Sequence, residues 1–79
     1  MSETELSRIQ NALVHCASKE VQSQRYRDNY HALPLMLQGI DAAMEAIGQG
    51  KAVDDALAMV FNDRLLDKMR KAAEISVIN

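Results

Sequence analysis

The chain is poor in the residues that usually brace a small protein. Its 79 residues include one cysteine, one proline, one phenylalanine and no tryptophan. The single cysteine, Cys16, excludes a disulfide within the chain, and together with the two histidines it does not reproduce the ligand spacing of a zinc site. A chain this short buries only about 60% of the surface that its unfolded form exposes. Its core must therefore come from aliphatic residues and methionine, and self-association would bury more surface.

Long apolar runs are also missing. No stretch approaches the roughly 20 apolar residues that span a bilayer. Residues 1–5 are polar and acidic, unlike the cationic start and apolar segment of a secretory signal. A lone thiol fits a reducing compartment. We therefore expect a cytoplasmic protein that makes no contact with a membrane.

What the sequence does have is a helical period. Apolar residues recur every third or fourth position, which places them on one stripe of an α-helix. The stripe of Leu6, Ile9 and Leu13 follows Ser2 and Glu5, which fit the capping box of a helix start. The pattern predicts an all-α fold, in which residues 1–79 form a single domain: a compact bundle of three or four short helices.

Proline and glycine divide the chain into these helices. Leu33 precedes a proline and is expected to be extended, so that Pro34 begins the second helix. Gly48 is expected to take the left-handed conformation that ends it. Asn62 and Asp63 are favoured N-cap residues, so we favour a break there over one continuous helix. The predicted helices cover residues 3–24, 34–47, 52–61 and 64–75, with the last two joined in the alternative.

One glycine lies inside a predicted helix instead of at its end. Gly39 costs about 1 kcal/mol relative to alanine at such a position. A close helix crossing there would account for it, because only glycine leaves room for a neighbouring helix to approach its backbone.

Residues for catalysis are scarce. His15 and Cys16 are adjacent, and neighbours on a helix point about 100° apart, so they do not form the hydrogen-bonded nucleophile–base pair of thiol catalysis. Residues 48–51 lack the spacing and the Ser/Thr of a phosphate-binding loop. Asp54 and Asp55 fit the first turn of a helix, where the dipole favours carboxylates. We therefore expect a protein that is not an enzyme and that uses no metal or cofactor.

Surplus apolar residues give the leading functional hypothesis. Consecutive apolar residues, as at 35–37 and 65–66, cannot all face one core, and those left outside mark a contact surface. The hypothesis is a non-enzymatic accessory or regulatory protein that binds another protein or a second copy of itself. The sequence leaves both a monomer and a homodimer or larger homo-oligomer open. The candidate contact residues are Tyr26, Tyr30, Leu35, Met36, Leu65 and Met69.

Segregated charge supports an alternative. Residues 31–63 hold one cation and five carboxylates, whereas residues 64–79 hold four cations and two carboxylates. In residues 25–31 cations alternate with aromatic residues, which suits phosphate contact and base stacking. The alternative is a small nucleic-acid-binding regulator. Its candidate residues are Arg25, Arg27, Arg64, Lys68 and Lys71.

The acidic middle of the chain suggests a third hypothesis. Asp54 and Asp55 would repel phosphate, which argues against this helix as a nucleic-acid reader, but they would suit an inhibitor that mimics nucleic acid. On the basic face, spacing of four predicts ordinary ion pairs within the last helix. These predicted pairs are Asp67 with Lys71 and Arg70 with Glu74.

Overall fold

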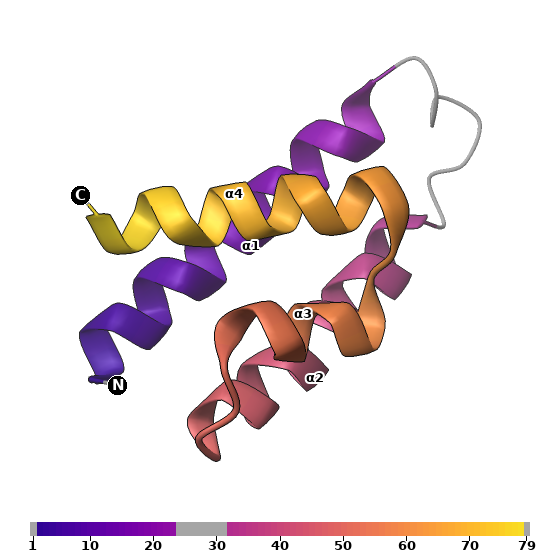
Figure 1. Cartoon of the computed structure of the whole chain (residues 1–79). Coiled ribbons are helices and arrows are strands. Elements are labelled where there is room, and N and C mark those ends of the chain that lie inside the picture. The colour runs from indigo at the N-terminus through magenta and orange to yellow at the C-terminus, as the bar shows by residue number, and fades with distance from the viewer. Residues whose placement is uncertain (1, 24–31, 79) are drawn as a thin grey trace.

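Four α-helices make up the part of the chain that the structure describes, residues 2–23 and 32–78 of a computed structural model (Figure 1). They are α1 (Glu3–Gln22), α2 (Ala32–Gly48), α3 (Val53–Val60) and α4 (Asp63–Ile78). No strand occurs in these residues. The all-α fold class predicted from the apolar period is confirmed, and so is the break between the third and fourth helices.

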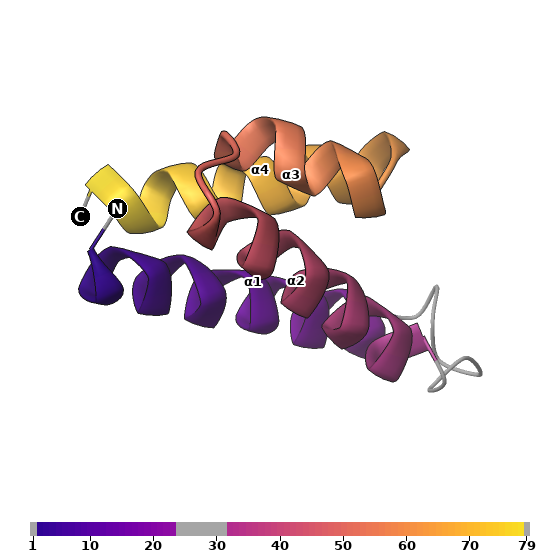
Figure 2. The same ribbon diagram turned by 90° about the horizontal axis from the view of Figure 1, so that it is seen from below.

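The helices pack as two layers of two. Figure 2 shows α1 beside α2 in one layer and α4 beside α3 in the other. Each helix packs against the next along the chain, and α4 also packs against α1, which closes the bundle. The radius of gyration of 12.0 Å for this 79-residue chain is close to the roughly 11.6 Å expected of a compact fold.

Aliphatic side chains form the core. The largest side chains that are fully removed from solvent are Ile9, Leu13, Ile40, Leu57 and Met69. Burying one such side chain contributes about 1.5–3 kcal/mol. Among the described residues no polar or charged residue is buried. Packing of apolar surface, and not an internal polar network, therefore holds the helices together.

Serines mark both ends of α1. The Ser2 hydroxyl accepts a hydrogen bond from the backbone N–H of Glu5 at 3.2 Å, which confirms the predicted N-cap. At the other end, the helix stops at Gln22, two residues earlier than predicted. The backbone N–H and the hydroxyl of Ser23 both donate to the carbonyl of Glu20. Serine side chains compete for backbone groups in this way, which favours a helix end.

The start of α2 corrects the prediction. The helix begins at Ala32, so Leu33 is helical, and the expectation that it is extended was wrong. Pro34 is the third residue of α2, not the first. It still lies in the first turn, where a backbone N–H has no acceptor within the helix, so its missing donor costs no hydrogen bond.

The end of α2 is capped by Gly50. Its φ of 103° is left-handed, whereas Gly48 is the last residue of the helix. The N–H of Gly50 bonds to the carbonyl of Ile47 at 3.0 Å, and the N–H of Lys51 bonds to that of Ala46 at 3.0 Å. These two bonds make a Schellman motif with Gly50 as its left-handed residue. The prediction had the right kind of cap but the wrong glycine.

Backbone geometry separates α3 from α4. Phe61 leaves the helix with extended angles, and Asp63 has a φ of 53°, a left-handed conformation in which aspartate is enriched. The backbone carbonyl of Asn62 accepts the N–H of Leu66 at 3.1 Å, so Asn62 caps through its main chain. The helix then continues to Ile78, three residues beyond the predicted end, because no glycine or proline interrupts it.

Gly39 permits the close crossing that its position predicted. A Cβ atom added at Gly39 would lie 3.2 Å from Cζ of Phe61 and 3.6 Å from Cβ of Val60. The missing side chain therefore lets the end of α3 approach the backbone of α2. Gly48 offers a contrast within the same helix, since a Cβ added there would meet nothing within 4 Å.

These two glycines give a matched test of the crossing. Gly39→Leu should lower the free energy of unfolding by about 1–3 kcal/mol, because the side chain must displace Phe61 from the core. Gly48→Leu should leave it unchanged or raise it by up to about 1 kcal/mol through helix propensity. Urea denaturation followed by circular dichroism measures both. Equal effects at the two positions would contradict the close approach at Gly39.

Candidate functional site

A groove of about 520 Å³ lies between α1 and α4, and in the part of the chain that the structure describes its lining comes from these two helices alone. The helices run antiparallel where they cross (Figure 1). We call this feature the α1–α4 groove. Its lining residues are Ala12, His15, Cys16, Lys19 and Glu20 from α1, and Lys68, Lys71, Ala72, Ile75 and Ser76 from α4.

Helical spacing explains why these residues share one surface. Successive lining positions are separated alternately by three residues and by one on each helix, so they fall on one face. That face borders the core stripe, which holds Leu13 on α1 and Met69 on α4. Ala12 and Ala72 lie at the edge of the stripe, half-buried. Their side chains are too short to fill the space between the helices, and a groove remains.

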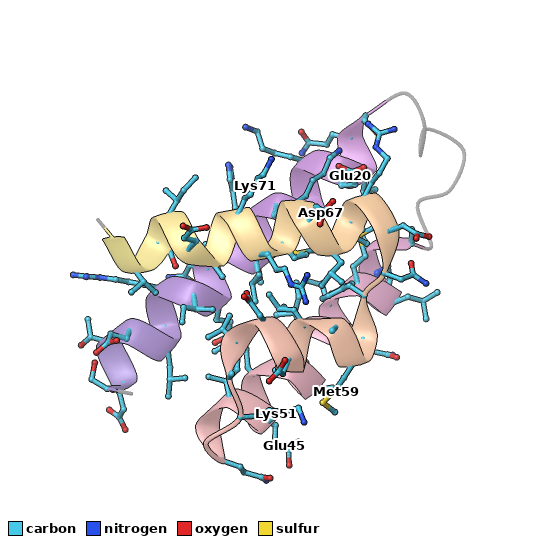
Figure 3. All side chains as sticks on the ribbon, in the orientation of Figure 1. Glu20, Glu45, Lys51, Met59, Asp67 and Lys71 are labelled. Atoms are coloured by element: carbon cyan, nitrogen blue, oxygen red, sulfur yellow. The ribbon has the colours of Figure 1, made fainter. Side chains whose placement is uncertain are left out.

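The groove has an apolar floor and a cationic rim. Ala12, Cys16 and Ala72 are half-buried in the floor, and Ile75 keeps 58% of its surface exposed at one end. Lys19, Lys68 and Lys71 also line the groove, and together with Glu20 they make up what we call its rim. Figure 3 shows Lys71 and Glu20 on one side of the molecule, away from Lys51 and Met59.

One carboxylate offsets part of the charge of the rim. Lys68 Nζ lies 2.6 Å from Glu20 Oε2, and the Glu20 side chain is only 13% exposed. This ion pair ties α1 to α4 across the groove. Among the described residues neither Lys19 nor Lys71 takes part in an ion pair. The rim therefore keeps a net positive charge.

The thiol of Cys16 stays protonated at neutral pH. Burial raises the pKa of Cys16, and the nearby carboxylate of Glu20 raises it further, while Lys68 and Lys19 lower it by less. Cys16 and His15 both line the groove, but no hydrogen bond joins them in the described part of the chain. The thiol acts as part of the apolar floor.

The structure distributes the predicted protein-contact residues over different environments. Met36 is 7% exposed and Met69 is fully buried, so both belong to the core and neither is available to a partner in this fold. Leu35 is 68% exposed and Leu65 is half-buried. None of these four residues lines the α1–α4 groove. Tyr26 and Tyr30 lie outside the described residues.

The predicted nucleic-acid residues are only partly brought together. Lys68 and Lys71 both line the groove, whereas Arg64 is exposed outside it. Arg25 and Arg27 lie outside the described residues. Lys68 is engaged by a carboxylate, as described above.

The acidic pair belongs to a separate contact. Arg70 donates through Nη2 to the backbone carbonyl of Asp54 at 3.3 Å, and its Nε lies 3.8 Å from Asp54 Oδ1. Asp55 is exposed. The predicted pairing of Arg70 with Glu74 is replaced by this contact between helices. In the described residues the predicted pair of Asp67 with Lys71 is also not formed.

The floor of the groove was not predicted from the sequence. Ala12, Ala72 and Ile75 were not singled out as a surface, although they border the core stripe. The available signal was a small residue on the edge of each stripe, with a lysine one residue before Ala72. Which edges of two helices meet cannot be read from either helix alone.

Comparisons with protein-family models, with curated proteins and with solved structures found no match to this chain. Among the described residues, no three histidine, cysteine or carboxylate side chains are placed to hold a metal ion. None of the helices in this part of the chain has both the length and the apolar character needed to cross a bilayer.

The environment of Cys16 predicts its reactivity. Because its pKa is raised, the rate of alkylation by iodoacetamide should reach half its maximum at a pH above the value for an unfolded thiol, about 8.5. Glu20→Gln should move this midpoint down, since it removes a carboxylate that raises the pKa. Lys19→Gln should move it up. A pH profile of the alkylation rate for the three proteins tests these signs.

The same shift affects stability. The folded protein holds the Cys16 proton more tightly than the unfolded chain does, so this contribution to stability is fully present below the unfolded pKa and is lost as the pH rises through the folded one. Cys16→Ala should flatten the loss of stability measured above about pH 8.5. An unchanged pH profile would contradict a raised pKa.

Proposed function

We propose that this protein is a non-enzymatic accessory or regulatory protein that acts by binding another protein through the α1–α4 groove. The observation that carries the proposal is the combination of an apolar floor with three lysines among the residues that line the groove. Protein-binding surfaces have this organisation, since a desolvated apolar centre supplies affinity while a polar rim sets orientation.

The reactive groups of the groove support binding better than catalysis. Thiol chemistry uses the thiolate, and the raised pKa of Cys16 disfavours it. His15, the nearest base in the sequence, is exposed and makes no hydrogen bond to the thiol within the described residues. We therefore assign Cys16 and His15 to the contact surface of the groove and not to a catalytic pair.

The nucleic-acid alternative receives less support. Phosphate binding draws its affinity from several unneutralised cations, and Lys68 is already paired with Glu20. The floor between the lysines is apolar, and a phosphate backbone gains nothing from it. The acidic-mimic alternative is weakened in the same way, because Asp54 contacts Arg70 of the same chain.

Two matched variants test the proposal. Ile75 and Met59 are both exposed apolar residues, at 58% and 60%, but only Ile75 lines the groove. We expect affinity capture from the native host to recover a protein partner. The Ile75→Glu variant should lose this partner, because a charge in the groove opposes its desolvation. The Met59→Glu variant should retain it. Quantitative mass spectrometry of the captured proteins measures the difference.

Light scattering and gel-shift measurements complete this test. Failure to capture any partner, combined with a monomer in light scattering, would contradict the proposal. A gel shift with nucleic acid that weakens with salt and is lost in Lys68→Glu with Lys71→Glu would support the alternative instead.

A further inference from the structure

Resting on the proposed function, we infer that the element bound in the α1–α4 groove is an amphipathic helix of the partner, with large apolar residues on one stripe and carboxylates beside it. Three properties of the groove carry this inference: its size, the helices that line it and the sign of its charge.

The size of the groove suits several large side chains. An apolar cavity of about 150 Å³ holds one benzene ring, so the 520 Å³ of the groove corresponds to about three side chains of that size. The floor itself offers short side chains, Ala12, Cys16 and Ala72. Small residues in the floor call for large residues in the occupant, such as leucine, phenylalanine or methionine.

The two helices that line the groove favour a helix as the occupant. A peptide that binds as a β-strand adds to a sheet edge, and one that binds as a polyproline II helix docks against aromatic side chains. The described residues contain no strand, and no phenylalanine, tyrosine or tryptophan among them lines the groove. A helix satisfies its own backbone hydrogen bonds and can lay an apolar stripe between two other helices. Apolar residues spaced at three and four would follow the groove past Ile75.

The rim selects the charge of the occupant. Among the described residues, three lysines, at positions 19, 68 and 71, and one carboxylate, that of Glu20, line the groove. Glu20 is already paired with Lys68. Carboxylates flanking the apolar stripe of an incoming helix would meet Lys19 and Lys71, whereas a basic helix would be repelled. Asp67 lies one turn before Lys71 but does not line the groove.

Two other occupants fit less well. If two copies met groove to groove, the lysines of both rims would face one another, and like charges oppose such a symmetric contact. A small molecule is normally buried over 70–90% of its surface, whereas the exposure of Ile75, 58%, leaves one end of the groove open to solvent.

Three synthetic peptides test the charge directly. Each has about 14 residues, roughly 21 Å of helix, with leucines at i, i+3, i+4 and i+7. The peptides differ only in the flanking residues, which are all glutamate, all glutamine or all lysine. Fluorescence anisotropy with the full chain should give the tightest binding for the glutamate peptide, weaker binding for glutamine and none for lysine. Binding of the glutamate peptide should weaken as salt is raised.

Matched variants locate the site. Lys71→Glu should weaken binding of the glutamate peptide about three- to tenfold, the range for loss of a surface ion pair and its replacement by repulsion. Lys51→Glu makes the same change of charge at an exposed position outside the groove, and should leave binding nearly unchanged. Ile75→Glu should abolish binding while Met59→Glu preserves it. Circular dichroism verifies that all four variants fold.

The outcomes of these experiments distinguish a failure of the inference from a failure of the proposed function. Equal binding of the glutamate and glutamine peptides, with loss in Ile75→Glu, would overturn the charge selection and leave the groove as a protein-binding surface. Laurate, an anionic acyl chain, tests the groove as a site for a small amphiphile. If laurate displaces the labelled glutamate peptide at a lower concentration than the unlabelled peptide does, the groove is assigned to such a ligand and the inference is overturned. No binding of any peptide would overturn the helix-in-groove assignment, and the captured partner would still decide the proposed function.

Discussion

Close packing of short aliphatic side chains is the constraint on which the rest of this structure depends. The chain has eleven alanines and one phenylalanine. In the interior Ala17, Ala43 and Ala56 are fully buried, and short side chains there let the helices approach closely enough to exclude water. At the edge of the α1–α4 contact Ala12 and Ala72 have the same short side chains but no third helix to cover them. One feature of composition therefore yields both a dry core and an open groove.

Periodicity was enough to predict the helices but not their ends. Burial of an apolar stripe stabilises each helix, and all four predicted helices are present. The ends depend on single hydrogen bonds that compete locally. Gly48 and Gly50 both suit a C-terminal cap, and the choice of Gly50 is made by the bonds to Ile47 and Ala46. Pro34 marked a first turn correctly but could not say which residue of that turn it occupies.

The groove could not be predicted for a different reason. A helical stripe says which residues face the core, whereas a groove depends on which edges of two helices meet. That geometry is fixed by the other helices of the bundle. Lys68 and Lys71 were singled out from the sequence as a basic face, and their position on α4 was correct. Glu20, the partner of Lys68, lies 48 residues before it in the chain, and no sequence pattern relates the two residues in a way that would reveal the contact.

Contacts between helices take precedence over the ion pairs expected within α4. Arg70 turns to Asp54 on α3, and Lys68 turns to Glu20 on α1. An exposed pair at a spacing of four contributes only about 0.3–0.5 kcal/mol, so the contact of Arg70 with Asp54 on α3 easily replaces the predicted pair of Arg70 with Glu74. Two cations of α4, Lys68 and Arg70, thus contact other helices of the bundle. Lys71 makes no such contact among the described residues and stays on the rim of the groove.

In the proposed complex, the lysines left on the rim would matter more for the choice of partner than the apolar floor would. An alanine floor accepts many apolar side chains, and one methylene more or less changes binding by about 1–3 kcal/mol at most. Discrimination between partners then comes from charge. A cation on the partner beside the floor loses the attraction to the lysines and is also repelled by them, which lowers its affinity further. In the proposed complex Lys19 and Lys71 would meet both requirements: they would attract the carboxylates of the partner helix, and they would repel the rim of a second copy. On this proposal, the charge of the rim lets a small bundle leave an apolar surface uncovered without that surface binding a second copy of the chain.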